Sequence, residues 1–412
     1  MPDGKGRSFG PWLWRDFRGK MSGTDDMRAL APPEYRLLCQ EVARALRPGA
    51  PLPAPLSAAE LKAIDWPLFL KGVAAHRVAA HLAAAPAGLF PDAVTAEIQR
   101  LSSRNALRSL RQMAEIIRLT ALFQQADIRM LTLKGPPLSQ KLYSHLGRRI
   151  SGDIDLLVDP ARFWEAEALL CANGYRAKSP TITRSRHQAV QHHLFHLTYF
   201  GPTSPVELHQ RLTTNPYWME NEFAVLWEQR EITAVGGCPV STLPPLDLPL
   251  YLCLHGFQHT WDRLGWLVDM DRLLTGPNAT AIMDHAERAG LGAAMRLTGA
   301  LCRLWLNTPL EIAPRDGARA RHFTRHFFSG NGWLGTPERK NWAEWKAHET
   351  RRMWRRVYLY TLKPTLRHVL QELRCDLLAP FDWEVLPLPR QLTWLYPLLR
   401  PVGWLIRAVR RS

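Results

Sequence analysis

Three acidic residues in the middle of the chain have the types and spacing needed to hold divalent metal ions. Asp153 and Asp155 are two residues apart in GDIDLLV, whose apolar residues predict a β-strand. Side chains alternate between the two faces of a strand, so both carboxylates share one face. Glu207 lies in PVELHQRL, a second strand-like segment, between Val206 and Leu208. Carboxylate oxygens are the ligands that Mg²⁺ prefers, often shared with substrate phosphates.

These acids predict a site that binds Mg²⁺ or Mn²⁺. Two carboxylates beside apolar neighbours repel each other, and a divalent cation removes that cost. If the strand with Glu207 pairs beside the strand with Asp153 and Asp155, three carboxylates converge. Two ions about 4 Å apart then activate an attacking hydroxyl and stabilise a leaving pyrophosphate. An Asp-x-Asp pair alone is also found at helix caps and on ordinary surfaces, so the third acid decides the interpretation.

Glycine and basic residues ahead of the acids are candidates for binding nucleotide phosphates. LKGPPL places Gly135 in a turn between a predicted strand and a predicted helix, where backbone N–H groups bind anions. Lys134 adds a point charge suited to a triphosphate. Arg148 and Arg149 can hold phosphate oxygens in a fork, and Ser151 belongs to the same predicted nucleotide-binding group. The alternatives are an ordinary tight turn for the glycine and solvated surface charges for the arginines.

Four further residues are candidates for contacting the acceptor substrate or for supporting the acids. His209 is two positions after Glu207 and shares its strand face. His255 and His259 are four apart in a predicted helix, and Arg263 continues their stripe. Such a polar stripe faces a cleft or consists of buried, hydrogen-bonded structural residues, and both interpretations stay open. The segment contains no HExxH motif, which excludes a zinc enzyme of that type.

The elements that must position these residues alternate between strand and helix. We expect strands at residues 128–133, 152–158, 193–200 and 205–212. Helical periodicity dominates before residue 125 and returns from about residue 215, where residues 247–274 form the longest predicted helix. The predicted fold class is therefore α+β, with a small mixed-sheet core flanked by N- and C-terminal helical regions.

This pattern divides the chain into five expected segments. They are a flexible tail (1–30), a helical region (31–125), the α/β core (126–214), a second helical region (215–345) and a basic Trp/Arg-rich segment (346–412).

The net charge of +16 indicates an affinity for polyanions but does not identify one. Residues 351–412 hold 12 Lys/Arg and four Asp/Glu, which is half of the excess. Trp383, Trp394 and Trp404 alternate with arginines there, a composition that suits weak contact with anionic membrane or nucleic acid. The favoured alternative is a segment packed over the helical region with its arginines in solvent.

The remaining composition favours a cytoplasmic location. Six cysteines are scattered without CxxC pairs, which argues against a zinc site or a disulfide framework. The N-terminus lacks the apolar core of a signal peptide. No uninterrupted apolar stretch reaches the roughly 18 residues that span a bilayer.

Taken together, the motifs resemble the uncharacterised nucleotidyltransferase family of the DNA polymerase β-like superfamily. LKG, a helix containing Tyr143, RRISGDIDLLV and VELH carry the resemblance, which extends over about residues 60–275. It implies that Asp153 and Asp155 are the metal pair, that Glu207 is the third carboxylate and that Gly135 belongs to the phosphate-binding turn.

One residue departs from the superfamily pattern. Pro136 stands where the superfamily usually has Ser or Gly after the turn glycine. Proline has no N–H to donate to a phosphate. Lys134 is the residue that can compensate for this loss.

The residues and the resemblance predict a Mg²⁺-dependent nucleotidyltransferase. It would move a nucleoside monophosphate from ATP or another nucleoside triphosphate to an unknown acceptor, which is a protein, peptide, nucleic acid or small molecule, and release pyrophosphate. One alternative is a DxD glycosyltransferase using a nucleotide-sugar, although such enzymes generally have a larger nucleotide-binding α/β domain ahead of the acids. The other alternative is a non-catalytic module that binds a nucleotide or a partner.

Overall fold

The computed structural model describes residues 31–53, 55–179, 194–219, 222–327, 333–334, 342–363 and 365–377, with a few positions between 386 and 406. The expected N-terminal tail over residues 1–30 lies outside these described residues. So do Trp383, Trp394 and Trp404 with the arginines that alternate with them.

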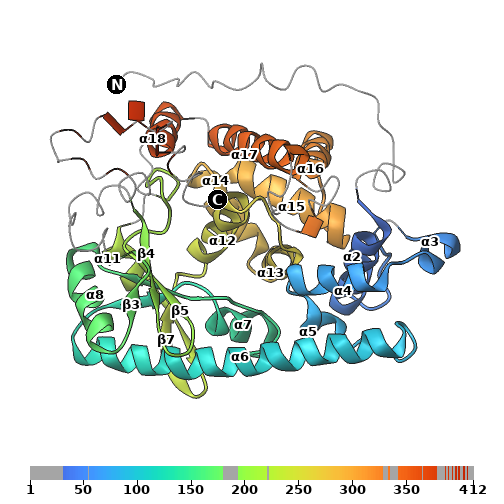
Figure 1. Cartoon of the computed structure of the whole chain (residues 1–412), viewed down its shortest axis with the longest axis horizontal. Coiled ribbons are helices and arrows are strands. Elements are labelled where there is room, and N and C mark those ends of the chain that lie inside the picture. Colours follow the sequence, from blue (N-terminus) through green and yellow to red (C-terminus); the bar gives the residue numbers. More distant parts are fainter. Residues whose placement is uncertain are drawn as a thin grey trace.

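A seven-stranded mixed sheet occupies one end of the molecule (Figure 1). The strand order is β3-β4-β5-β2-β1-β7-β6. β2 runs parallel to β5 and β1 parallel to β7, whereas the other neighbours are antiparallel. The sheet confirms the predicted α+β fold class and the four predicted strands. The strands are β1 (Met130–Thr132), β2 (Ile154–Val158), β3 (Arg176–Ala177), β4 (His196–Phe200), β5 (Pro205–His209), β6 (Glu231–Val235) and β7 (Cys238–Thr242).

One edge of the sheet lies in a region that we expected to be helical. After α11 (Phe223–Glu228) the chain forms the β6–β7 hairpin instead of continuing in helices, so the expectation of helix from residue 215 is wrong there. Gly236 and Gly237 make the turn with φ of 57° and 81°, a backbone region that favours glycine. A Gly-Gly pair between β-type runs is a hairpin signal that the helical interpretation overlooked.

The longest helix, α6 (Asp92–Gln125), extends under both halves of the molecule along the lower edge of Figure 1. Its N-terminal half packs against α4 (Trp66–Ala75) and α5 (Ala79–Leu82). Its C-terminal half buries Ile116, Leu119 and Phe123 in the core that also contains apolar side chains of the sheet and of α8 (Phe163–Ala172). Helix α6 therefore fixes the N-terminal helical region relative to the sheet.

One of the N-terminal helices, α3, begins with a capping box. Ser57 accepts a hydrogen bond from Glu60 N–H, and Glu60 accepts one from Ser57 N–H. The helices are α2 (Pro33–Leu46), α3 (Ala58–Lys62), α4 (Trp66–Ala75) and α5 (Ala79–Leu82).

The helix predicted over residues 247–274 is two helices. Thr260 and Trp261 adopt left-handed conformations, with φ of 55° and 51°, between α12 and α13. The fully buried Trp261 ring packs against Gly256. Any side chain at residue 256 would clash with this ring, because a Cβ added to Gly256 would lie 2.4 Å from it. The helices are α12 (Asp247–Gln258), α13 (Leu264–Leu274), α14 (Ala279–Arg288), α15 (Gly292–Leu306), α16 (Pro314–Phe327), α17 (Trp342–Leu362) and α18 (Leu366–Leu377).

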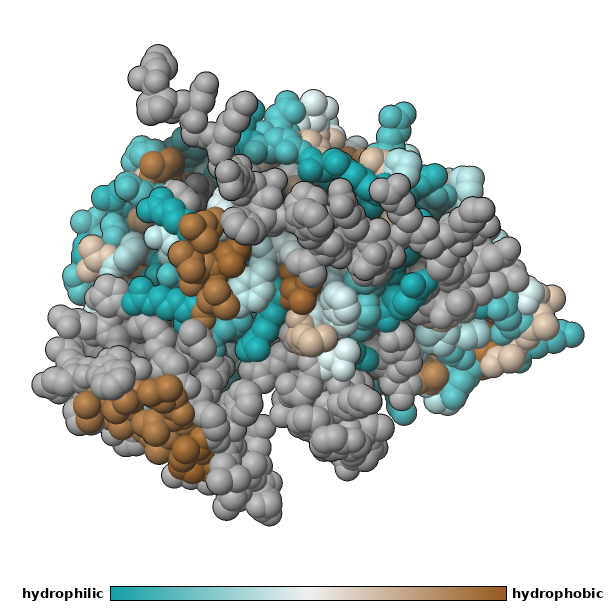
Figure 2. All heavy atoms as spheres, turned by 90° about the horizontal axis from the view of Figure 1, so that it is seen from above, coloured by the Kyte–Doolittle hydropathy of each residue, from teal (hydrophilic) through white to brown (hydrophobic). Residues whose placement is uncertain are grey.

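Figure 2 looks onto the face that carries α16–α18 and shows apolar side chains gathered in patches among polar ones. Met353, Leu366 and Leu370 are among the exposed apolar residues of α17 and α18. Among the helices that the structure describes, none combines the length and apolar character needed to cross a membrane.

A buried histidine joins the N-terminal helices to α13. His76, just after α4, accepts a hydrogen bond at Nδ1 from Leu264 N–H over 3.0 Å. Its carbonyl accepts the next N–H, that of Gly265. Two otherwise unpaired donors at the start of α13 are thereby satisfied. Burial, with a smaller effect of the positive charge on Arg263, lowers the pKa of His76 to about 4.

Acidification should therefore destabilise the fold through His76. Between pH 6.5 and about pH 4 the unfolded chain binds a proton at His76 that the folded chain does not. Stability is fully present above this window and falls by about 3 kcal/mol through it. Urea unfolding at pH 7 and pH 4 measures the loss of stability between the two pH values. The variant His76→Asn keeps an acceptor but does not titrate, so its loss should be smaller than that of the wild type by about 3 kcal/mol. An equal loss in the two proteins would contradict this role.

Candidate active site

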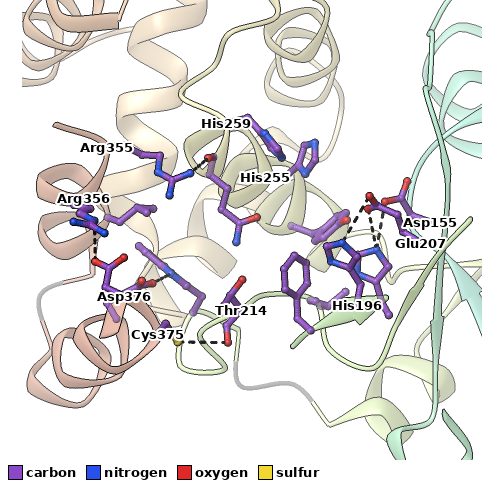
Figure 3. A pocket seen from close by; sticks show the side chains of 18 of the residues that line it. Asp155, His196, Glu207, Thr214, His255, His259, Arg355, Arg356, Cys375 and Asp376 are labelled. Atoms are coloured by element: carbon purple, nitrogen blue, oxygen red, sulfur yellow. Dashed lines mark hydrogen bonds and ion pairs between the residues drawn. The ribbon is translucent and has the colours of Figure 1, made fainter. Parts of the chain in front are cut away.

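The strand register brings two of the three predicted catalytic acids together. In the parallel pair β2–β5, Asp155 and Glu207 are Cα partners. Both side chains line a cavity of about 350 Å³ between the sheet and the helices (Figure 3). Asp155 is buried, whereas Glu207 is partly open to the cavity. The sequence predicted which acids are on strands, and the pairing of β5 beside β2 makes them neighbours.

Lys134 and Gly135 follow β1, and Lys134 lies beside Asp155. Leu133 N–H donates to the carbonyl of Asp155, which fixes the end of β1 against β2. The Lys134 ammonium is 3.1 Å from Asp155 Oδ1 and 3.4 Å from His255 Nε2. Gly135, with φ of 84°, precedes α7 (Pro136–Tyr143), whose first two residues are both proline. The helix therefore offers no N–H at those two positions, and Lys134 is the charged donor beside Asp155.

Two histidines also contact the acids. His209 Nε2 is 3.4 Å from Asp155 Oδ1 and 3.6 Å from Glu207 Oε2. His196, on the neighbouring strand β4, places Nε2 3.7 Å from Glu207 Oε1. His196 and His209 are Cα partners across β4–β5, and their ring centroids are 4.9 Å apart. His209 was predicted from the sequence as a candidate residue, but His196 was not. An antiparallel pairing of the predicted strands HLTYF and VELH could have identified His196 as the neighbour of His209.

The negative charges of the acids at this site are compensated by the neighbouring histidines. Burial raises the pKa of Glu207, but the close approach of His209 and the charges of both histidines outweigh it and hold the pKa at about 2. Burial lowers the pKa of His209, but the nearby carboxylates of Asp155 and Glu207 leave the pKa raised overall. Burial lowers the pKa of His196 to about 4, so its ring is neutral at pH 7 with a free lone pair.

Asp153 lies just before β2 and does not line the cavity. Ser151 Oγ donates to its backbone carbonyl over 2.9 Å and lies 3.3 Å from its Oδ1. Gln112 on α6 donates to the carbonyl of Ser151, which ties this turn to the long helix. The charge of Asp153 still acts on Glu207, whose pKa it raises slightly against the larger effects of burial and His209. Ser151 is therefore placed to orient Asp153.

The donor atoms of the cavity fit a cation. Neither carboxylate oxygen of the buried Asp155 and neither ring nitrogen of His209 makes a well-aligned hydrogen bond, although Lys134 Nζ and His209 Nε2 lie 3.1 and 3.4 Å from Asp155 Oδ1. Within the described part of the chain, His196, Glu207 and His209 form the one group whose potential metal-binding atoms all lie within 4.8 Å of one another. Unsatisfied buried oxygens and nitrogens that converge on one point are the environment that metal ions occupy in proteins.

The predicted phosphate fork of Arg148 and Arg149 is not formed. Arg149 is buried, and its Nε donates to Asp269 Oδ2 on α13 over 2.7 Å. Tyr143 OH donates to the other oxygen of Asp269 over 2.8 Å. Arg148 donates to the carbonyl of Ala80. Neither arginine lines the cavity, because each is held by a partner in the helical regions.

The histidine stripe is split by the break between α12 and α13. His255 and His259 line the cavity, and burial lowers the pKa of each, to about 4 for His259. Arg263 precedes α13, places its guanidinium 4.7 Å from the centre of the Trp266 ring and lies outside the cavity. Only the first two residues of the predicted stripe therefore face the cleft.

Arg77 is a half-buried basic residue near Asp153 that is not among the site residues predicted from the sequence. Its φ of 57° is unusual for a residue other than glycine, and its guanidinium donates to the carbonyl of Ile150. Burial, with a further effect of Arg263, lowers the pKa of Arg77 to about 10, and Asp153 acts in the opposite direction. Arg77 therefore lies close enough to Asp153 to feel its charge, and it does not line the cavity that contains Glu207.

The far wall of the cavity comes from α17 and α18 (Figure 3). Asp376 accepts a hydrogen bond from Tyr360 OH over 2.7 Å and pairs with Arg356 over 3.1 Å. Arg355 donates to the carbonyl of Gln258 at the end of α12. The acids on the sheet and these polar residues thus face the same space from opposite ends.

Fold and site together define an α+β protein whose sheet presents adjacent acids to a cavity with basic side chains, an arrangement suited to nucleotidyl transfer. A family model described as an uncharacterised nucleotidyltransferase matches residues 62–307. The chain belongs to this family. No curated protein and no solved structure matches the chain. Membership of this family does not favour the alternative of a glycosyltransferase that uses a nucleotide-sugar. The helices α16–α18 lie beyond the residues that the family model matches.

The Arg149–Asp269 pair should be essential for stability. The variant Asp269→Asn leaves the buried Arg149 without a countercharge, which typically costs about 3–5 kcal/mol. Glu165→Gln is the matched control, because Glu165 pairs with Arg162 on the surface and is 59% exposed. The control should cost less than about 1 kcal/mol. Urea unfolding of the two variants measures both values, and equal small costs would contradict the structural role of Asp269.

Proposed function

We propose that this chain is a metal-dependent nucleotidyltransferase that moves a nucleoside monophosphate from a nucleoside triphosphate to an acceptor and releases pyrophosphate. The acids Asp155 and Glu207 would hold Mg²⁺ or Mn²⁺ with the help of Asp153. The ion, when bound, supplies positive charge that neutralises the triphosphate and the acceptor oxygen.

The observation that carries this proposal is the side-by-side register of Asp155 and Glu207 at the wall of a cavity, with Lys134 at hydrogen-bond distance from the first. Two acids on adjacent strands repel each other unless a cation lies between them. A protein that only needed a stable sheet would be better served by apolar residues there. The family to which the chain belongs supports the same class of reaction.

The side chains have separate tasks in this reaction. Lys134 binds phosphate oxygens and keeps Asp155 in place through its ion pair. Asp155 or Glu207 accepts the proton of the acceptor hydroxyl. The acceptor oxygen then forms a bond to the α-phosphorus, while the bond from that phosphorus to the bridging oxygen of the β-phosphate breaks. Pyrophosphate leaves with the electron pair of the broken bond.

The acceptor would bind toward α17 and α18. A cavity of about 350 Å³ falls within the range of small-molecule sites, which is roughly 300–1,000 Å³. Gln258 and His259 at the end of α12 and Arg355 on α17 line the same cavity as the acids. Because α17 and α18 lie beyond the residues matched by the family, the acceptor is the part of the reaction in which this chain would differ from other members.

The test is pyrophosphate release from each of the four common nucleoside triphosphates with Mg²⁺ or Mn²⁺ and a panel of acceptors. Asp155→Asn keeps the shape of the side chain and removes its charge. It should lower kcat/KM by at least about 100-fold, the size expected for a group that stabilises transition-state charge. Asp127→Asn is the matched control, since Asp127 is exposed in the turn before β1 with φ of 52°, which Asn also tolerates.

Metal-dependent release that is unchanged in Asp155→Asn would refute the proposal. Transfer of a labelled sugar from a nucleotide-sugar, blocked by the same variant, would support the glycosyltransferase alternative instead. Nucleotide binding in calorimetry without turnover on any acceptor would support a non-catalytic module.

A further inference from the structure

We propose that His196 and His209 complete a nitrogen-rich metal position with Glu207, which selects a divalent transition-metal ion over Mg²⁺. This inference rests on the proposed function, because Glu207 is shared with the predicted site for the catalytic ion. It goes further by assigning ligands that are not carboxylates and by predicting which ions this position prefers.

The distances match those between ligands of one ion. Imidazole nitrogens and carboxylate oxygens bind such ions at about 2.0–2.2 Å, which leaves neighbouring ligand atoms about 3–3.5 Å apart. Glu207 has His209 Nε2 3.6 Å from one oxygen and His196 Nε2 3.7 Å from the other. Asp155 Oδ1 lies 3.4 Å from His209 Nε2 and can add a fourth ligand. The donor atoms of His196, Glu207 and His209 all lie within 4.8 Å of one another, so side-chain rotations would bring them to these distances around an ion.

The sheet holds the two imidazole rings in position. Their residues are direct partners across the antiparallel strands β4 and β5, so neither backbone has to move to bring them together. Phe195 packs edge-on against both rings, with centroids 4.2 Å from His196 and 5.5 Å from His209. Both ring nitrogens of His209 are buried without a hydrogen bond, which is costly unless an ion or another ligand uses them.

The chemistry of these donors sets the ion preference. Mg²⁺ demands near-octahedral oxygen ligands and keeps several waters, so a position with two imidazoles suits it poorly. Imidazole nitrogen suits first-row transition ions, whose affinities exceed that of Mg²⁺ at mixed nitrogen and oxygen sites. The other oxygen of Asp155, Oδ2, makes no hydrogen bond and would remain available for a second, harder ion.

The competing interpretation is that His209 and His196 only orient Glu207 by hydrogen bonding. It predicts that removing an imidazole changes the binding of all divalent ions in the same proportion. A metal position with nitrogen ligands predicts a change in selectivity. The ratio of the Mg²⁺ and Mn²⁺ dissociation constants therefore separates the two interpretations.

The experiment is calorimetric titration of the metal-depleted full chain with Mn²⁺ and with Mg²⁺. The variants are His196→Asn and His209→Asn, in which an amide oxygen stands in place of a nitrogen ligand. Each should lower the Mg²⁺-to-Mn²⁺ ratio of dissociation constants by at least about tenfold, the usual size of a ligand-environment effect. His259→Asn, in the same cavity but without a carboxylate contact, is the matched control and should leave the ratio within about twofold of wild type.

A second measurement needs no variant and is unaffected by misfolding. Pulsed electron paramagnetic resonance of wild-type protein with bound Mn²⁺ should show coupling to ¹⁴N of imidazole. Absence of this coupling, or an unchanged ratio in both folded histidine variants, would overturn the inference. Neither readout depends on turnover, so nitrogen ligation without nucleotidyl transfer would refute the proposed function alone, and transfer without nitrogen ligation would refute this inference alone.

Discussion

The parallel pairing of β2 with β5 imposes the constraint on which the rest of the site depends. It puts Asp155 and Glu207 on adjacent strands, which lie about 4.8 Å apart in a sheet. Two negative charges at roughly 5 Å in a partly buried site repel each other by about 3 kcal/mol. Lys134 and His209 lie at ion-pair distance and offset this repulsion. The sheet thus creates a demand for positive charge, which the metal ions that accompany a nucleotide would supply.

The helical regions hold the elements that carry Asp155 and Glu207 in place, and both side chains remain beside the cavity. Helix α6 packs against the sheet in a shared core. Asp269 on α13 binds both Tyr143 and Arg149 and so fixes the segment between α7 and β2. The same contacts hold Arg149 outside the cavity. Lys134 is the basic side chain beside Asp155, and its ammonium is shared between Asp155 and His255.

Much of the fold and part of the site could be predicted from local patterns. The alternation of apolar residues identified β2 and β5, and the position of Asp155 and Glu207 within them followed directly. The β6–β7 hairpin was missed because its Gly-Gly turn stands in a stretch with mixed periodicity. The partners of Arg149 and the proximity of His196 to Glu207 depend on contacts between residues far apart in the sequence. No local pattern encodes such contacts.

The position of a bound metal ion tests most directly whether Asp155 and Glu207 form the metal site. A crystal structure with Mn²⁺ and a non-hydrolysable nucleoside triphosphate analogue, measured at the manganese absorption edge, would locate the ion by anomalous scattering. The account predicts an anomalous peak within about 2.3 Å of oxygens of both Asp155 and Glu207, with the triphosphate bound on the same side. A nucleotide bound elsewhere, with no peak between these two carboxylates, would contradict it.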